Sequence, residues 1–264
     1  MSFIGAVFGK KRGSVLLIGA GPGDVELLTL KAVRALGRAD IVLLDDLVNP
    51  AIRQFCRDDV RIIPVGKRGG CRSTPQDFIN RLMRRYARQG LTVARVKGGD
   101  PCMFGRAGEE KAFLEASGVL VEIINGLTAG LVAATSIGVP LTDRRHTRGV
   151  TFVTGHTKEG GTPDWRALVA GGTTLVIYMG MKQMPSIVAG LQAAGMSPSM
   201  PVAVIANASL PHQAQVVTTL ACMQDDARRE ALASPAVIVV GEVVREASVL
   251  PLADMASSGL EMAL

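Results

Sequence analysis

The sequence predicts an α/β protein built from two α/β domains. Short runs of Val, Ile and Leu end in glycine-rich or polar turns, and most are followed by a segment with helical spacing of its apolar residues. This alternation stops once, at a polar and basic stretch, and then resumes. Aromatic residues make up only 4% of the 264 residues whereas glycine occurs 30 times, a composition that suits short buried strands between helices better than a β-sandwich.

The first half of the chain predicts five strands that alternate with helices. The strands are expected at residues 15–18, 41–44, 61–65, 92–96 and 120–124. The helices are expected at residues 27–36, 78–86, 108–117 and from about 128 onward. The second of these helices carries the strongest local signals, because Thr74, Pro75 and Asp77 resemble an N-cap, a first-turn proline and an acidic first turn. Gly90 is expected to end that helix.

A polar, basic and proline-containing stretch, GVPLTDRRHTRG at residues 138–149, marks the connection between the two domains. After it, strands are expected at residues 150–153, 174–178, 202–206 and 236–240, separated by helical stretches. A chain of this length accommodates two ordinary cores. We therefore predict domains at residues 13–140 and 149–250, a linker at 141–148, and tails at 1–12 and 252–264.

Cysteine, histidine and hydropathy patterns argue against a metal centre and against a membrane protein. The four cysteines form no CxxC pair, and none of the three histidines is spaced as in HExxH. The apolar run near the N-terminus precedes the positive charges, the reverse of a secretory signal, and no later run reaches about 18 apolar residues. We expect a cytoplasmic protein with no metal and no membrane partner. The net charge of +6 suits either nucleic acid or an acidic small molecule.

The first glycine motif, GAGPGD at residues 19–24, lies between a predicted strand and a predicted helix, and three interpretations stay open for it. It resembles a dinucleotide fingerprint in which Asp24 replaces the last glycine, with Asp45 at the end of the next strand as the ribose-binding acid. It is also compatible with a plain tight turn. Finally, Pro22 makes a rigid turn whose exposed backbone is suited to line a ligand.

The second glycine motif, KGGDP at residues 97–101, runs into FGRAGEE at residues 104–110. Paired glycines let the backbone approach a ligand closely, and Asp100 is placed to accept hydrogen bonds from a ligand's amine or hydroxyl groups. A purely structural turn is the alternative. Arg106 and Glu109 have the spacing that puts them on one helix face, either as ligand contacts or as a simple surface ion pair.

Polar and basic residues elsewhere add to the candidate site. Arg144 and Arg145, with His146 and Arg148, form a cluster suited to carboxylates or phosphates, although solvated linker charge is an equal alternative. No aromatic residues are interleaved with the cluster, so binding of nucleic acid is not expected. In the second half, YMG at residues 178–180 and IANAS at 205–209 follow buried strands, where ligands collect in α/β sheets, whereas Met179 alone is also typical of core packing.

Together these motifs resemble the tetrapyrrole methylases across residues 13–241. The resemblance is carried in a consistent order by GAGPGDVELLTLKA, the strand end at Asp45 with LVN, VGKRGG, VKGGDP with FGRAGEE, GLTAG, PLTDRR, TFVTGH and YMG. It implies two α/β domains with the active-site cleft between them, S-adenosylmethionine as the cofactor, and a homodimer. The cofactor contacts that it implies are Pro22, Gly98, Gly99, Asp100, Met103, Thr128, Ala129, Met179 and Ala208.

The same resemblance implies roles for charged residues. Asp45 and Lys67 match the family's proposed base and proton donor, with Arg106 beside them in the catalytic set. Arg106, Glu109, Arg144 and Arg145 are expected to face the substrate. The chain departs from the usual family pattern at four positions. Leu44 stands where the family more often has Tyr, and Met103 stands where it has a bulky aliphatic residue. Asn125 replaces a proline, and Asp143 replaces a histidine.

The implied activity is transfer of two methyl groups to uroporphyrinogen III, at C2 and C7, giving precorrin-2 and two molecules of S-adenosylhomocysteine. An electron-rich pyrrole carbon attacks a sulfonium methyl, so most of the catalysis is positioning. The acetate and propionate groups of the substrate would give the arginines and the positive net charge a use. Alternatives are a sibling methylase that acts on a later corrin precursor and, more remotely, an NAD(P)-binding oxidoreductase or a passive nucleotide-binding module.

Overall fold

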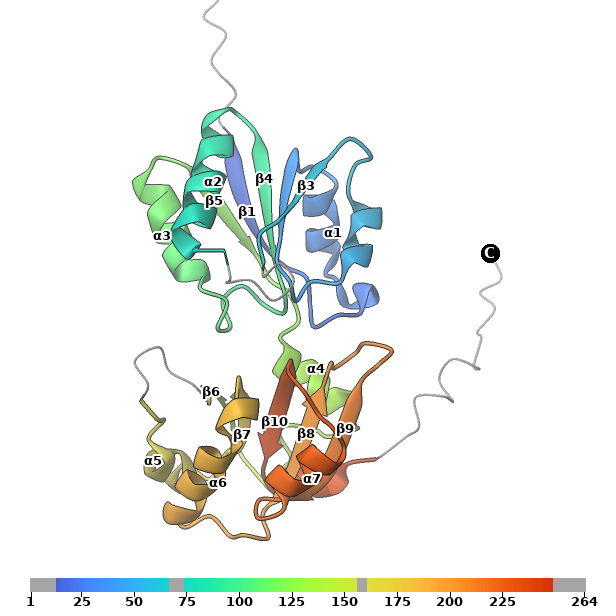
Figure 1. Ribbon diagram of the computed structural model, residues 1–264, viewed down its shortest axis with the longest axis vertical. Helices are drawn as coiled ribbons and strands as arrows, with labels where there is room; N and C mark the ends of the chain where they lie inside the picture. Colours follow the sequence, from blue (N-terminus) through green and yellow to red (C-terminus); the bar gives the residue numbers. More distant parts are fainter. Residues whose placement is uncertain (1–12, 67–73, 156–160, 249–264) are drawn as a thin grey trace, which may run out of the picture. The chain divides into compact units, whose positions relative to one another are not determined.

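The computed structural model describes residues 13–66, 74–155 and 161–248, and the chain forms two compact units, Met1–Ala129 and Gly130–Leu264 (Figure 1). Each unit contains a five-stranded sheet with helices packed against it. The predicted α/β class and the two-domain organisation are confirmed. The division falls before the stretch at 141–148, and the domain bounds expected from the sequence stay a prediction.

The sheet of the first unit is entirely parallel, with strand order β3-β2-β4-β1-β5. Its strands are β1 (Ser14–Gly19), β2 (Ile41–Leu44), β3 (Arg61–Pro64), β4 (Thr92–Lys97) and β5 (Leu120–Ile124). The central strands read as nearly continuous apolar runs because both of their faces are covered. All five carboxyl ends therefore lie along one edge, from which the glycine-rich loops emerge.

Helices cover both faces of this sheet (Figure 1). One face packs against α1 (Leu30–Leu36) and the 3-10 helix η2 (Pro50–Phe55), and the other packs against α2 (Gln76–Arg88) and α3 (Ala107–Ala116). Alternate residues of each strand point to alternate faces, so Leu16 and Ile18 contact the first layer whereas Val15 and Leu17 contact the second. Among the described residues no helix is long and apolar enough to cross a membrane.

The second unit has a mixed sheet with strand order β6-β7-β10-β8-β9. Its strands are β6 (Val150–Thr154), β7 (Thr174–Tyr178), β8 (Pro201–Ala206), β9 (Ala214–Thr219) and β10 (Ala236–Val240). Only β6 and β7 are parallel, and the other neighbours run antiparallel. The helices are α4 (Ala129–Thr135), α5 (Trp165–Ala170), α6 (Met184–Ala193) and α7 (Met223–Arg229), and the last three pack on the core formed around Leu175, Val204 and Ile238.

The starts of two helices differ from what the sequence predicts. The first long helix begins at Leu30 rather than near residue 27, because Asp24 caps a separate 3-10 turn, Val25–Leu27, and the hydroxyl of Thr29 then accepts the amide of Ala32 at 3.1 Å. Thr74 is not the N-cap of α2, so that prediction is wrong. Its hydroxyl instead donates to the carbonyl of Gly66 at 3.2 Å.

Candidate cofactor and substrate site

The two glycine motifs of the first unit are hydrogen-bonded to each other. The amide of Gly21 donates to the carbonyl of Gly99 at 3.2 Å, and the amide of Gly99 donates to the carbonyl of Gly21 at 2.7 Å. Both glycines have positive φ, 72° and 68°, a conformation that side chains disfavour. This pairing holds the loop after β1, which carries Pro22, against the loop after β4, which carries Gly98 and Asp100.

A third loop, after β5, closes against the same pair so tightly that only glycine fits. A Cβ on Gly19 would lie 2.5 Å from the amide nitrogen of Gly126 and 2.6 Å from the carbonyl oxygen of Gly99. A Cβ on Gly126 would meet the same Gly99 oxygen at 2.4 Å. Backbone from three strand ends is therefore packed without intervening side chains, and these glycines serve the packing between loops as well as the turns.

Asp100 ties two of these loops together. Its Oδ1 accepts the amide of Cys102 at 2.8 Å, and its Oδ2 accepts the amide of Gly126 at 3.1 Å and the side-chain nitrogen of Asn125 at 3.2 Å. Asn125, one of the departures from the family pattern, thus supplies a hydrogen bond that proline has no group to make. A carboxylate has about four acceptor positions, so these three bonds leave capacity for a ligand.

The remaining residues of the first unit predicted to bind the cofactor lie around the same loops. Thr128 is buried, and a Cβ on Gly99 would lie 3.9 Å from the Cα of Thr128 and 3.8 Å from the nitrogen of Ala129. The amide of Met103 donates to the carbonyl of Asp100 at 3.2 Å. The structure therefore brings together Pro22, Gly98, Gly99, Asp100, Met103, Thr128 and Ala129 at one sheet edge.

Asp45 follows β2 at that edge with its carboxylate held on both oxygens. Oδ2 accepts Nη2 of Arg95 at 2.6 Å, and Oδ1 accepts the amide of Asp46 at 2.9 Å. The side chain of Asp45 is 32% exposed whereas that of Arg95 is 3% exposed, so the ion pair has one open side and one buried side. Lys67, the predicted proton donor, lies outside the described residues.

Behind Asp45 lies a buried charged cluster that the sequence reasoning missed, made of Arg95, Lys97 and Glu110. Oε1 of Glu110 accepts Nζ of Lys97 at 3.1 Å, Nε of Arg95 at 3.4 Å and Nε2 of Gln76 at 2.9 Å. Burial lowers the pKa of the Lys97 ammonium, as does the nearby Arg95, while Glu110 and then Asp45 act in the opposite direction. The available signal was the alternation of charges in TVARVK, an otherwise apolar predicted strand.

Arg106 and Glu109 form the ion pair that their spacing predicts, on the exposed start of α3. Nη2 of Arg106 lies 2.5 Å from Oε2 of Glu109, and Nε lies 3.1 Å from Oε1. The hydrogen bond to Glu109 raises the pKa of Arg106. Arg106 is thus present at the edge of the first sheet, but its guanidinium is already engaged by its neighbour.

Arg144 and Arg145 of the second unit differ in their surroundings. Arg145 contacts Asp143, with Nη2 to Oδ2 at 2.9 Å and Nε to Oδ1 at 3.0 Å, and it also pairs with Glu246 at 3.0 Å. Its side-chain hydrogen bond holds the pKa of Asp143 well below the usual range. Asp143, at a position where the family usually has histidine, therefore forms an ion pair with Arg145. The neighbouring Arg144 is exposed.

Backbone strain is concentrated in the predicted ligand loops. Among the described residues, six that are not glycine have positive φ, and five of them follow β4, β7 or β8: Phe104, Arg106, Met179, Asn207 and Ser209. Such conformations cost about 1–3 kcal/mol each and cluster at functional sites. Met179 is also 53% exposed, which excludes core packing as the reason for this residue, whereas Ala208 is buried.

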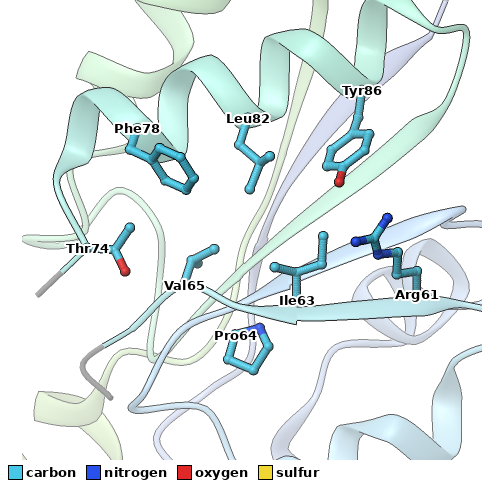
Figure 2. A pocket seen from close by; sticks show the side chains of 8 residues that line it. All are labelled: Arg61, Ile63, Pro64, Val65, Thr74, Phe78, Leu82 and Tyr86. Carbon is cyan, nitrogen blue, oxygen red and sulfur yellow. The ribbon is translucent and has the colours of Figure 1, made fainter.

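A groove elsewhere on the first unit contains none of the predicted site residues. It runs between β3 and α2, where Phe78, Leu82 and Tyr86 point from the helix toward Ile63 and Val65 (Figure 2). Its lining is mostly apolar. The described residues also contain no group of three or more His, Cys, Asp or Glu side chains placed to hold a metal ion.

Comparison with known proteins identifies the class of protein to which this fold and these loops belong. The family model described as tetrapyrrole (corrin/porphyrin) methylases matches residues 14–224. The chain therefore belongs to the tetrapyrrole methylases, a family of S-adenosylmethionine-dependent methyltransferases, as its motifs predict.

Within this family the chain is similar to particular enzymes. It is 57% identical over 234 residues to a uroporphyrinogen-III C-methyltransferase of Pseudomonas aeruginosa, covering 89% of this chain and 95% of the relative. It is 54% identical to the enzyme of that name from Pseudomonas fluorescens, covering 87% and 92%. The crystal structure of a uroporphyrin-III C-methyltransferase from Thermus thermophilus with S-adenosylhomocysteine matches with a TM-score of 0.75 and 39% identity, covering 88% of this chain and 99% of that one.

Proposed function

We propose that the chain methylates uroporphyrinogen III twice, at C2 and C7, and releases precorrin-2 and two molecules of S-adenosylhomocysteine. The observation that carries the proposal is the 57% identity, across nearly the full length of both chains, to an enzyme named for this reaction. The sibling activity on a later corrin precursor is not favoured by these relatives, and neither is an NAD(P)-dependent oxidoreductase.

The loops of the first unit fit S-adenosylmethionine. Gly99 leaves its backbone uncovered at the point where a Cβ would stand, at ordinary contact distance, 3.8 Å, from the nitrogen of Ala129. Backbone groups of Gly98 and Gly99 and the remaining acceptor position of Asp100 suit the ligand's amine and hydroxyl groups. We assign cofactor binding to Pro22, Gly98, Gly99, Asp100, Met103, Thr128 and Ala129, and in the second unit to Met179 and Ala208. When bound, the cofactor supplies an electrophilic methyl group on a sulfonium.

Asp45 is proposed as the group that takes the proton. Once a pyrrole carbon of the substrate carries the new methyl group, that carbon has four carbon substituents and its ring is cationic. Neutrality is restored when a proton leaves from elsewhere in the macrocycle, either from the ring nitrogen or from an adjacent bridging carbon. The Asp45 carboxylate is paired with Arg95 and open on one side, so it has a lone pair available for that proton. Lys67 is proposed to steady a substrate carboxylate or return a proton.

The substrate's rim of carboxylates is proposed to meet the arginines. Arg106, with Glu109 beside it, and Arg144 are the first choices because guanidinium groups bind carboxylates in bidentate fashion. Arg145 contributes less in this proposal, since Asp143 and Glu246 already neutralise it. We also propose that the enzyme works as a cytoplasmic homodimer and binds neither nucleic acid nor membrane, as the family resemblance suggests.

The test is turnover of uroporphyrinogen III by the purified protein with S-adenosylmethionine. We expect two methyl groups per tetrapyrrole by mass spectrometry and two equivalents of S-adenosylhomocysteine. Turnover of a later corrin precursor without turnover of uroporphyrinogen III would instead establish the sibling activity. Protection against heat by NAD(P) but not by S-adenosylhomocysteine would support the oxidoreductase alternative.

A further inference from the structure

We infer that Arg95 is a positioning residue for the reaction, because its buried guanidinium, anchored by Glu110, fixes the carboxylate of Asp45 at the end of β2. The inference rests on the proposed role of Asp45 as the proton acceptor. It assigns a function to two buried residues, Arg95 and Glu110, to which the motifs gave no role, and it explains why a charged cluster is placed inside the first unit.

The sheet register places Arg95 and Asp45 side by side. Arg95 is paired with Leu43 on β2 and with Leu17 on β1, both fully buried, so its side chain emerges between two leucines on the face covered by α2 and α3. The amide of Asp45 continues the ladder by donating to the carbonyl of Val96 at 3.2 Å. Strand alternation then turns the Asp45 side chain to the same face as Arg95.

Glu110 fixes the other side of Arg95 and joins separate elements. It lies in the first turn of α3 with no exposed surface, and it receives Arg95 and Lys97 from β4 and Gln76 from the first residue of α2. The guanidinium of Arg95 also donates through Nη1 to the carbonyl of Val96 at 3.3 Å. Three nitrogens of Arg95 are therefore engaged, and only the Nη2 end reaches toward the partly exposed Asp45.

The charges of this cluster balance only when Asp45 is included. Counted by formal charge, Arg95 and Lys97 contribute two positive charges and Glu110 contributes one negative charge, which leaves one formal positive charge on these three buried residues. The carboxylate 2.6 Å from Arg95 supplies the missing negative charge. Because the other three side chains are nearly inaccessible, Asp45 is the one member of this described group that presents charge to a ligand.

Stability alone does not explain this arrangement. A buried ion network is often no better for folding than apolar residues of similar volume, because desolvation offsets the attraction between the charges. On the same face of the sheet, two residues before Arg95, Val93 and its register partner Val15 are apolar and fully buried. On this face of β4 the charged side chains are Arg95 and Lys97, near the end of the strand and beside Asp45. Holding a carboxylate in one orientation benefits catalysis at that place.

The experiment compares Arg95→Gln, Arg95→Lys, Asp45→Asn and the double variant Asp45→Asn/Arg95→Gln in steady-state turnover of uroporphyrinogen III. For Arg95→Gln we expect kcat to fall roughly 10- to 100-fold, at or below the usual contribution of general base catalysis, with KM changed by less than about threefold. Arg95→Lys should recover part of kcat, because an ammonium still supplies charge and a donor. The double variant should be no slower than Asp45→Asn, because Arg95 acts through Asp45.

The outcomes separate this inference from the proposed function. Wild-type kcat in Arg95→Gln, or losses that multiply in the double variant, would overturn the positioning role while leaving Asp45 as the base. Wild-type kcat in Asp45→Asn would overturn both assignments, whereas absence of any turnover by the wild-type chain would refute the proposed reaction. If Arg95→Gln does not fold, Glu110→Gln replaces it, with a comparable fall in kcat expected and unchanged affinity for S-adenosylhomocysteine as the control.

Discussion

Replacing Glu110 by alanine is expected to destabilise the first unit far more than the same change one residue earlier. Glu110 is fully buried, and its Oε1 accepts hydrogen bonds from Gln76, Arg95 and Lys97. Removing it leaves two buried cations without their shared acid. Breaking a buried ion pair from one side costs about 3–5 kcal/mol.

That cost is a large fraction of the total stability of a domain, which is about 5–15 kcal/mol. For a unit of this size the melting temperature should fall by roughly 10–20 °C. The matched control is Glu109→Ala, which removes an exposed carboxylate from the same helix turn and breaks the surface pair with Arg106, worth about 0–1 kcal/mol. Circular dichroism melts and urea titrations measure both variants.

Equal melting temperatures for the two variants would refute the reasoning, because it rests on the difference in burial between adjacent glutamates. Glu110→Gln adds a second check. The amide keeps the volume and one acceptor oxygen but loses the charge, so its stability should lie between that of the wild type and that of Glu110→Ala. A Gln variant as unstable as the alanine variant would mean that charge alone decides the cost.

Three further predictions concern the loops and the second unit. Gly19→Ala should weaken binding of S-adenosylhomocysteine at least tenfold by calorimetry, because its Cβ would overlap the backbone of two neighbouring loops. The control is Gly108→Ala, which has open space around it on α3 and should leave affinity unchanged while it stabilises the helix by about 0.5–1 kcal/mol. Arg144→Ala should raise KM for the tetrapyrrole roughly tenfold, whereas Arg145→Ala should mainly lower the melting temperature, because Arg145 is paired with Asp143 and Glu246. Equal effects of the two variants on KM would contradict the assignment. Arg145 lowers the pKa of Asp143 in the folded state, so this pair stabilises the fold at pH values above the ordinary pKa of 3.8, and its contribution is lost as the pH falls through the folded pKa. When the pH is lowered from neutral to below 3.8, the melting temperature of Asp143→Asn should therefore fall less than that of the wild type. Parallel curves of melting temperature against pH would count against the pair.

Local sequence patterns determined most of the first unit. Strand β2 has the bounds that its apolar run predicts, because a parallel strand buried on both faces must be apolar along its whole length. Strand β5 also has its predicted bounds, although it lies at the edge of the sheet and contains Glu122. The motifs around Gly99 and Asp100 also predicted that their loops lie together, since loops at the carboxyl ends of parallel strands meet at one edge, while their role in ligand binding stays a prediction. Family membership followed from the order and spacing of these motifs.

Strand β9 shows where local patterns are insufficient. Its sequence, AQVVTT, is half-exposed and polar, and it forms a strand because β8 pairs with it along its whole length. The antiparallel direction of β8 and β10 is likewise absent from the sequence pattern, because apolar runs carry no information about strand direction. These features depend on partners distant in the chain.

The sequence by itself determined the fold class, the family and the set of loops that form the candidate site. Only the tertiary structure decided which charges are paired. Asp45 and Arg95 lie fifty residues apart in the chain, yet their oxygen and nitrogen are 2.6 Å apart because β2 and β4 are neighbours in the sheet. Electrostatic roles depend on distance and burial, and both quantities are fixed only when separate segments pack together.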